Sequence, residues 1–168
     1  MNNYEERFNI AKQLHSSGRI EESQKIYLDL AKIYKNNYTL FYLIGTAFLQ
    51  LKKFDDAIDN FHTSININSN FPEVYNNLGI ALAEKEKYSE ALVNYNKAIK
   101  LKNDYIDAYI NRGVSLKNLK KFQGAISDLN FVIKTQPLNP LEHNNLGNIF
   151  KELKNVNQKC CKFKLQLA

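Results

Sequence analysis

Four asparagines share one position in a regular spacing along the chain. They are Asn9, Asn77, Asn111 and Asn145, and Leu43 takes the remaining place in the same series. An Asn side chain offers two hydrogen-bond donors and an acceptor oxygen, so a row of such amides can bind the main-chain peptide groups of another polypeptide. We call these four residues the asparagine column, and we expect its ligand to be an extended peptide.

No group of residues resembles a catalytic or metal-binding motif. The three histidines, His15, His62 and His143, have no cysteine or carboxylate partners at metal-ligand spacing. The sequence contains no Gly-rich phosphate loop and no nucleophile elbow. The adjacent Cys160 and Cys161 are expected to be inert thiols, with reversible lipidation as the alternative. We therefore expect no enzyme activity, no catalytic residue, no metal and no cofactor.

The spacing of the asparagines extends to other residue types and defines a repeat. Four of the six glycines, Gly45, Gly79, Gly113 and Gly147, follow it, and the alanines at 57, 91 and 125 form a parallel series. A fixed period of about 34 residues is typical of a solenoid. We predict a single array over residues 1–168, with repeats at 4–37, 38–71, 72–105 and 106–139 and a partial or capping repeat at 140–168.

Each repeat has two stripes of apolar residues at helical spacing. In the third repeat Tyr75, Leu78 and Leu82 form the first stripe, and Tyr95 and Ile99 belong to the second. The small Gly and Ala residues are expected where the two helices approach most closely. Each repeat is therefore predicted to be a helical hairpin.

The repeat pattern resembles the tetratricopeptide repeat (TPR) family over nearly the whole chain. The residues of the resemblance in the third repeat are Tyr75, Leu78, Gly79, Leu82, Tyr88, Ala91, Tyr95 and Ala98. Repeats two to four match the family pattern well, whereas the first and last depart from it. The resemblance implies an all-α fold, a right-handed solenoid of stacked antiparallel helical hairpins, whose concave surface is formed by the first helix of each hairpin.

The family resemblance also implies where a ligand binds, because TPR ligands usually lie in the concave groove. The expected peptide-binding residues are Asn76, Asn77, Asn111, Asn144, Asn145, Asn148, Tyr42, Thr46, Ile80, Val114, Glu73 and Asp107. The asparagines would hold the ligand main chain, as in the similar asparagine ladder in the TPR superhelix of O-linked N-acetylglucosamine transferase. Glu73 and Asp107 would favour peptides with Lys or Arg. The alternative is that these amides are merely solvated in a chain that contains 23 asparagines.

Another use of the TPR groove, the carboxylate clamp for acidic C-terminal peptides, needs cations that this sequence lacks. At the matching places of repeats two to four stand Tyr42, Thr46, Asn77, Asp107 and Asn111. None of these side chains is positive, and Asp107 would repel a carboxylate. Binding of a chaperone tail through such a clamp is not expected.

Positive charge is concentrated at the turns between the two helices of each hairpin. The net charge is +6, and the turn lysines are Lys52, Lys53, Lys85, Lys87, Lys117, Lys120, Lys121, Lys151 and Lys154. Lysines at a helix C-terminus favour the helix dipole and solubility, which is the interpretation we prefer. The alternative is a basic edge that attracts nucleic acid, anionic lipid or an acidic partner. We expect no specific nucleic acid, no membrane span and a cytoplasmic location.

The residues together predict a non-catalytic scaffold for protein-protein interaction that binds an extended peptide in its concave groove. One alternative is the substrate-recognition arm of a larger enzyme such as a glycosyltransferase. Another is a self-associating module, in which Phe150, Leu153 and Phe163 would pair two arrays as a homo-oligomer through the C-terminal end.

Overall fold

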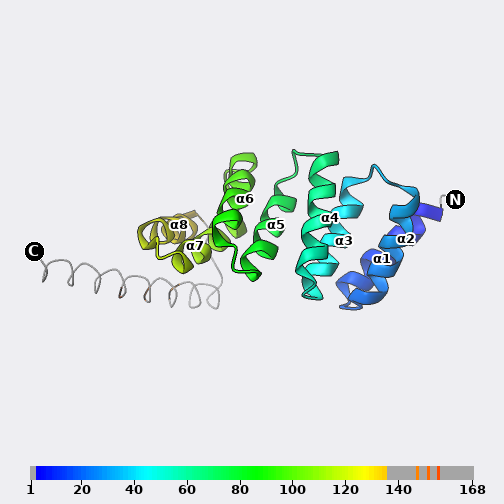
Figure 1. Cartoon of the computed structure of the whole chain (residues 1–168), viewed down its shortest axis with the longest axis horizontal. Helices are drawn as coiled ribbons and strands as arrows, with labels where there is room; N and C mark the ends of the chain where they lie inside the picture. The colour runs from blue at the N-terminus through cyan, green and yellow to red at the C-terminus, as the bar shows by residue number, and fades with distance from the viewer. Residues whose placement is uncertain (1–2, 136–146, 148–150, 152–154, 156–168) are drawn as a thin grey trace, which may run out of the picture.

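The chain folds into a row of antiparallel helical hairpins that follow one another along the long axis (Figure 1). The computed structural model describes residues 3–135 together with Gly147, Lys151 and Asn155. Residues 3–135 contain no strand, and their helices are α1 (Asn3–Ser16), α2 (Ile20–Ile33), α3 (Tyr38–Gln50), α4 (Phe54–Ile67), α5 (Pro72–Glu84), α6 (Tyr88–Leu101), α7 (Ile106–Asn118) and α8 (Phe122–Thr135). The prediction of an all-α repeat fold is confirmed.

The first helices α3, α5 and α7 begin at the same position of successive repeats, and local chemistry marks two of these starts. Before α3, Asn37 is the N-cap residue, and its side chain accepts a hydrogen bond from the Leu40 amide at 3.1 Å. Pro72 opens α5, where a helix does not need the amide proton that proline lacks. The residues assigned by sequence to the start of the second, third and fourth units therefore begin a helix.

The turn inside each hairpin has the same backbone geometry in four successive repeats. Lys52, Glu86 and Lys120 have positive φ angles of 58–59°, and Gly18 has 82° at the equivalent place. The amide of the following residue bonds five residues back, as Lys87 does to the Leu82 carbonyl at 2.9 Å. This is the Schellman arrangement that ends a helix. Non-glycine residues occupy a left-handed conformation here in three of the four turns.

The glycine column lies where the two helices of a hairpin meet, but not equally closely in each repeat. A Cβ atom added to Gly79 would lie 2.5 Å from the Tyr95 ring, and one added to Gly45 would lie 2.6 Å from the Phe61 ring. At Gly113 the nearest atom would be the Asp128 Cβ at 3.6 Å, which is ordinary contact. A side chain is therefore excluded in the second and third repeats but not in the fourth.

The first helices of successive hairpins form one face of the array. Helix α5 packs on both α3 and α7, whereas neither α4 with α6 nor α6 with α8 makes a contact of this extent. Neighbours that approach more closely lie on the inside of a curved solenoid. The concave face is therefore formed by α3, α5 and α7.

Part of the predicted groove and of the predicted association surface lies outside the described residues. This applies to Asn144, Asn145 and Asn148, and to Phe150, Leu153 and Phe163. The predictions for these residues remain untested.

Candidate functional site

The predicted peptide-binding residues of repeats two to four all lie on the three helices of the concave face. Helix α3 contains Tyr42 and Thr46, helix α5 contains Glu73, Asn76, Asn77 and Ile80, and helix α7 contains Asp107, Asn111 and Val114. Equivalent positions on successive helices face the same side because the repeat length is constant. The structure therefore places these nine residues on the helices of one face, although Asn76 is buried within it.

Asn77 of the asparagine column links α5 to α3. Its Nδ2 donates to the Tyr42 hydroxyl and to the Thr46 hydroxyl, both at 3.3 Å. Its Oδ1 accepts a bond of 3.4 Å from the Nδ2 of Asn76 on the same helix. Asn77 thus uses both its donor and acceptor groups within the protein.

Asn76 extends the same hydrogen-bonded row to α7. Its Oδ1 accepts a bond of 3.0 Å from the Nδ2 of Asn111, and its side chain also bonds that of Tyr105. Asn77, Asn76 and Asn111 therefore form one continuous chain of amides that connects three helices. We call these three residues together with Tyr42 and Thr46 the amide row.

The burial of Asn76 differs from its predicted role as a peptide contact. Its side chain belongs to a residue that is only 4% exposed, whereas Asn77 and Asn111 are half-buried. An amide that is shielded by its neighbours and bonded to Asn77 and Asn111 is not presented to a ligand. In this structure Asn76 connects the repeats, and Asn77 and Asn111 are the more exposed amides beside it.

Two half-buried tyrosines, Tyr42 within the amide row and Tyr105 next to it, have carboxylates nearby. Burial is the main cause that raises the pKa of the Tyr105 hydroxyl, and the charges of Asp107 and Glu73 add to it. Burial also raises the pKa of Tyr42, to which the nearby Glu73 contributes. Both carboxylates are therefore close enough to act on Tyr105, and the Lys102 ammonium also lies 4.9 Å from the centre of its ring.

A cavity of about 300 Å³ opens beside the amide row between α5, α6 and α7. Ile80 and Val114 form apolar parts of its wall, and Asn111 lines it as well. An Asn side chain has two donors, and one of those of Asn111 is used in the bond to Asn76. Asn111 is therefore a member of the asparagine column that lies on a cavity wall.

Sequence reasoning missed a buried ion pair in the fourth repeat. Arg112 donates from Nε and Nη2 to the two carboxylate oxygens of Asp128, at 2.8 and 2.6 Å, and from Nη1 to Asn96 at 2.7 Å. The Asp128 side chain is 6% exposed and that of Arg112 22%. Hydrogen bonds to Asp128 are the largest cause that raises the pKa of the Arg112 guanidinium.

The signal for this pair was present in the repeat alignment. At the position of Arg112 the preceding repeats have Ile44 and Leu78, and Asp128 stands where they have Asn60 and Asn94. In this one hairpin an arginine replaces an apolar residue, and an aspartate replaces an asparagine. The two replacements occur together and have opposite charges. The pair fixes α7 to α8, and the bond to Asn96 connects it to α6.

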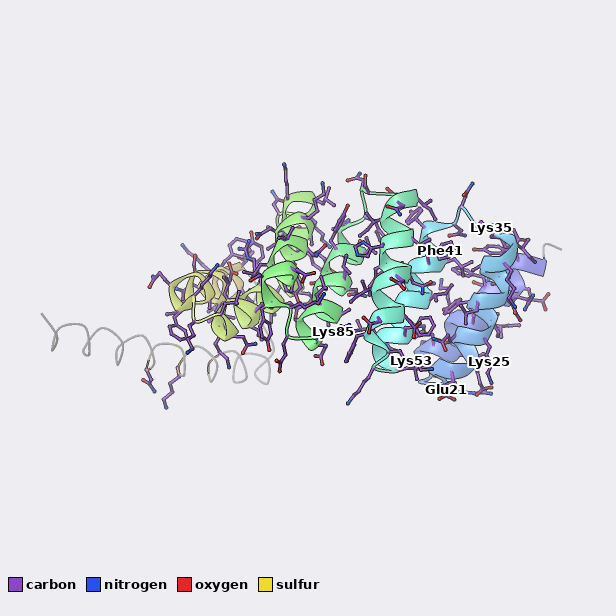
Figure 2. All side chains as sticks on the ribbon, viewed as in Figure 1. Glu21, Lys25, Lys35, Phe41, Lys53 and Lys85 are labelled. Atoms are coloured by element: carbon purple, nitrogen blue, oxygen red, sulfur yellow. The ribbon has the colours of Figure 1, made fainter. Side chains whose placement is uncertain are left out.

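The lysines of the hairpin turns are partly neutralised by neighbouring carboxylates. Lys53 and Lys85 lie along the same lower edge of the array in Figure 2. Lys85 forms an ion pair with Asp55, and Lys87 lies 3.5 Å from a Glu90 carboxylate oxygen. These contacts agree with the interpretation of the lysines as solvated turn residues.

Two absences can be stated for the part of the chain that the structure describes. In that part no three His, Cys, Asp or Glu side chains gather as metal ligands would. None of the helices there has the length and apolar character that a membrane crossing requires.

Comparison with known proteins agrees with the repeat pattern. The TPR repeat model matches residues 45–85 and 81–120. No curated protein shows significant sequence similarity to the chain.

Solved structures share the fold at low sequence identity. The chain is similar to MamA protein, with 20% identity and a TM-score of 0.76 over 94% of this chain and 85% of that one. It is similar to the first TPR of Spaghetti (RPAP3) bound to HSP90 peptide SRMEEVD, with 22% identity and a TM-score of 0.67 over 72% of this chain and 93% of that one. The Arabidopsis OM64 TPR domain is 20% identical, with a TM-score of 0.65 over 70% of this chain and 94% of that one.

The matched repeat model, the column of glycines and the row of helical hairpins lead to one conclusion. Residues 45–120 are tetratricopeptide repeats, and the row of helical hairpins has the fold of the solved TPR structures.

Proposed function

We propose that this chain is a non-catalytic scaffold that binds an extended polypeptide along the concave face formed by α3, α5 and α7. The observation that carries the proposal is the amide row beside an open cavity, with Asn111 belonging to both. Main-chain peptide groups need paired donors and acceptors, which a half-buried amide supplies. The apolar Ile80 and Val114 on the cavity wall would contact ligand side chains.

The chemistry of the groove also favours one class of peptide over another. The first TPR of Spaghetti (RPAP3) was solved with the acidic peptide SRMEEVD. At the clamp positions taken from the family pattern, the present chain has Tyr42 and Thr46, both bonded to Asn77, and the carboxylate of Asp107. Neutral and negative groups at these places disfavour an acidic ligand. We expect SRMEEVD not to bind and peptides with Lys or Arg to bind.

A binding selection tests the proposal directly. The whole chain is immobilised and presented with a random dodecapeptide library, and the affinity of one selected peptide is measured by fluorescence anisotropy. Asn111→Ala should weaken that affinity about tenfold, which is about 1.4 kcal/mol. Asn94→Ala is the matched control, because Asn94 lies on α6 and its side chain bonds the Glu90 carbonyl of the same helix.

The outcomes separate clearly. Equal affinities of the wild type and Asn111→Ala, with unchanged helicity by circular dichroism, would remove Asn111 from the site. Failure of the library to yield any binder would reject peptide binding by this face. Tight binding of SRMEEVD would contradict the expected charge preference.

A further inference from the structure

Two cavities on the concave side of the array are equivalent and lie one repeat apart. The first, of about 300 Å³, is the cavity beside Asn111, between α5, α6 and α7. The second, of about 240 Å³, lies one repeat earlier and is lined by Leu49, Gln50, Lys52, Phe54, Ile80 and Glu84. Each of these six lining residues has its counterpart, one repeat later in the sequence, on the wall of the first cavity. The two cavities are therefore copies of one feature of the repeat.

The two copies differ in charge. Where the earlier cavity has Gln50 and Lys52, the later one has Glu84 and Glu86. Lys52 and Glu86 occupy the same left-handed turn position, with φ angles of 58° and 59°. The backbone is the same at both places, so the exchange places a carboxylate of the later cavity where the earlier one has a cation.

The two carboxylates of the later cavity are not neutralised by the lysines around them. Among residues 3–135, neither Glu84 nor Glu86 forms an ion pair within 4 Å, whereas Lys85 pairs with Asp55 and Lys87 with Glu90. The polar atoms at the bottom of the cavity are satisfied, because the buried Tyr95 bonds to the buried Ser115. Glu84 and Glu86 therefore remain as negative groups available to a ligand.

The placement of these groups fits a long cationic side chain. Glu84 and Glu86 are exposed, whereas Tyr95 and Ser115 are each 1% exposed, so the carboxylates lie at the mouth of the cavity. The methylenes of a lysine or arginine can pack on an apolar wall while the charged group stays near water. Ile80 would contact the methylenes, and the two carboxylates would bind the ammonium or guanidinium group.

We propose that the cavity containing Glu84 and Glu86 is a specificity pocket for one lysine or arginine side chain of the bound peptide. This inference rests on the peptide binding proposed above and adds the residue that the peptide must contain. Helices packed side by side lie about 8–10 Å apart. An extended chain covers about 3.3–3.6 Å per residue. The peptide residue at the earlier cavity is thus about three positions away, and it is not cationic, because the charges of Lys52 and Glu84 on that wall offset each other.

The selection described above also tests the pocket. Peptides selected by the wild type should be enriched in Lys or Arg at one position. The variant Glu84→Gln/Glu86→Lys installs the residues of the earlier cavity, and Lys already occupies this turn conformation at Lys52 and Lys120. It should lose the enrichment and bind the selected peptide at least tenfold more weakly. Changing the peptide Lys to Met, which keeps an unbranched apolar chain, should weaken binding to the wild type but not to the variant.

Two further variants control for charge and position. Glu6→Gln/Glu21→Lys makes the same change in net charge on the first hairpin and should keep the enrichment. Gln50→Glu/Lys52→Glu makes the earlier cavity acidic, and peptides selected with it should have a second Lys or Arg about three positions from the first.

The results distinguish the pocket from the proposed function. If the wild type binds peptides without any preference for Lys or Arg, or if Glu84→Gln/Glu86→Lys keeps that preference, the pocket is rejected while peptide binding stands. If the wild type selects no peptide, peptide binding is rejected and the pocket with it.

Discussion

The third and fourth hairpins have the same backbone plan but different interiors. In α5/α6, Gly79 lies directly against the Tyr95 ring, and Leu78 is buried at 1% exposure. In α7/α8, Gly113 makes only ordinary contacts, and Arg112 replaces the leucine and bonds to Asp128. The repeat therefore fixes where helices begin and end, while the contacts between them vary from one copy to the next.

This difference shows that equivalent positions of the repeat, such as Gly79 and Gly113, need not contribute equally to stability. Glycine is required in the third hairpin because an aromatic ring fills the space beside it. The same glycine in the fourth hairpin faces Leu129, whose Cδ2 would lie 3.7 Å from an added Cβ. An apolar position accepts a cation only where the same hairpin supplies the carboxylate. The predictions below test each part of this comparison.

The largest effect is expected from breaking the ion pair of the fourth hairpin. Arg112→Leu should lower the free energy of unfolding by about 3 kcal/mol, because Asp128 then stays buried without its partner. Arg112→Leu/Asp128→Asn installs the residues of the third hairpin and should recover most of that loss. Urea unfolding followed by circular dichroism measures both. Equal losses in the single and double variants would show that the pair is not what stabilises this hairpin.

Substitution of Gly79 and Gly113 by alanine should change the free energy of unfolding by a smaller amount, and in opposite directions. Gly79→Ala should cost about 1–2 kcal/mol, because the added methyl group forces the Tyr95 ring to move. Gly113→Ala should stabilise by roughly 0.5–1 kcal/mol, because alanine favours the helix and has room. Thermal unfolding of the two variants gives the comparison. Destabilisation by Gly113→Ala as large as that by Gly79→Ala would refute the difference in packing.

The left-handed turn has the same geometry in the third and fourth hairpins, so a substitution by glycine there should change the stability equally in both. Glu86→Gly and Lys120→Gly each place glycine in a left-handed conformation that costs an ordinary residue about 1–2 kcal/mol. The greater freedom of glycine in the unfolded chain offsets part of this gain, so each variant should stabilise by roughly 0.5 kcal/mol. Lys100→Gly, inside helix α6, is the control and should destabilise. Unequal gains in the two turns would show that they differ in more than sequence.

The smallest effect is expected on the stability at alkaline pH. It depends on Tyr95 of the third hairpin, whose place is taken by Leu129 in the fourth. Burial raises the pKa of Tyr95, so its hydroxyl keeps the proton in the folded state when tyrosines of the unfolded chain ionise near pH 10. The folded state then binds more protons than the unfolded state, and stability falls as pH rises. Tyr95→Phe should reduce the slope of the urea midpoint against pH between about pH 9 and 11. An unchanged slope would contradict this assignment.

The fold was predictable because the repeats carry the same set of signals again and again. Helical spacing, a small residue at the helix crossing and lysines at the turn recur in successive copies. A signal that is weak in one repeat is therefore supplied by the equivalent residues of the others. The left-handed turn was not predicted, because Lys52, Glu86 and Lys120 are not residues that favour positive φ.

The candidate site was predictable only as far as the surface on which it lies. The register places Asn77 and Asn111 on the first helices, but it does not tell which amides bond to each other. The burial of Asn76 depends on contacts with Asn111 and Tyr105 from a neighbouring helix. The pocket at Glu84 and Glu86 depends likewise on α6 and α7 closing around α5.

The amide row also has a mechanical consequence. Its bonds of 3.0–3.3 Å join α3 to α5 and α5 to α7 on the inner side of the curved array. Polar atoms at these distances cannot approach much further, so the row resists tighter bending, whereas straightening the array must stretch the same bonds. If a peptide binds this face as proposed, the spacing of its contacts is set by the protein rather than by the peptide.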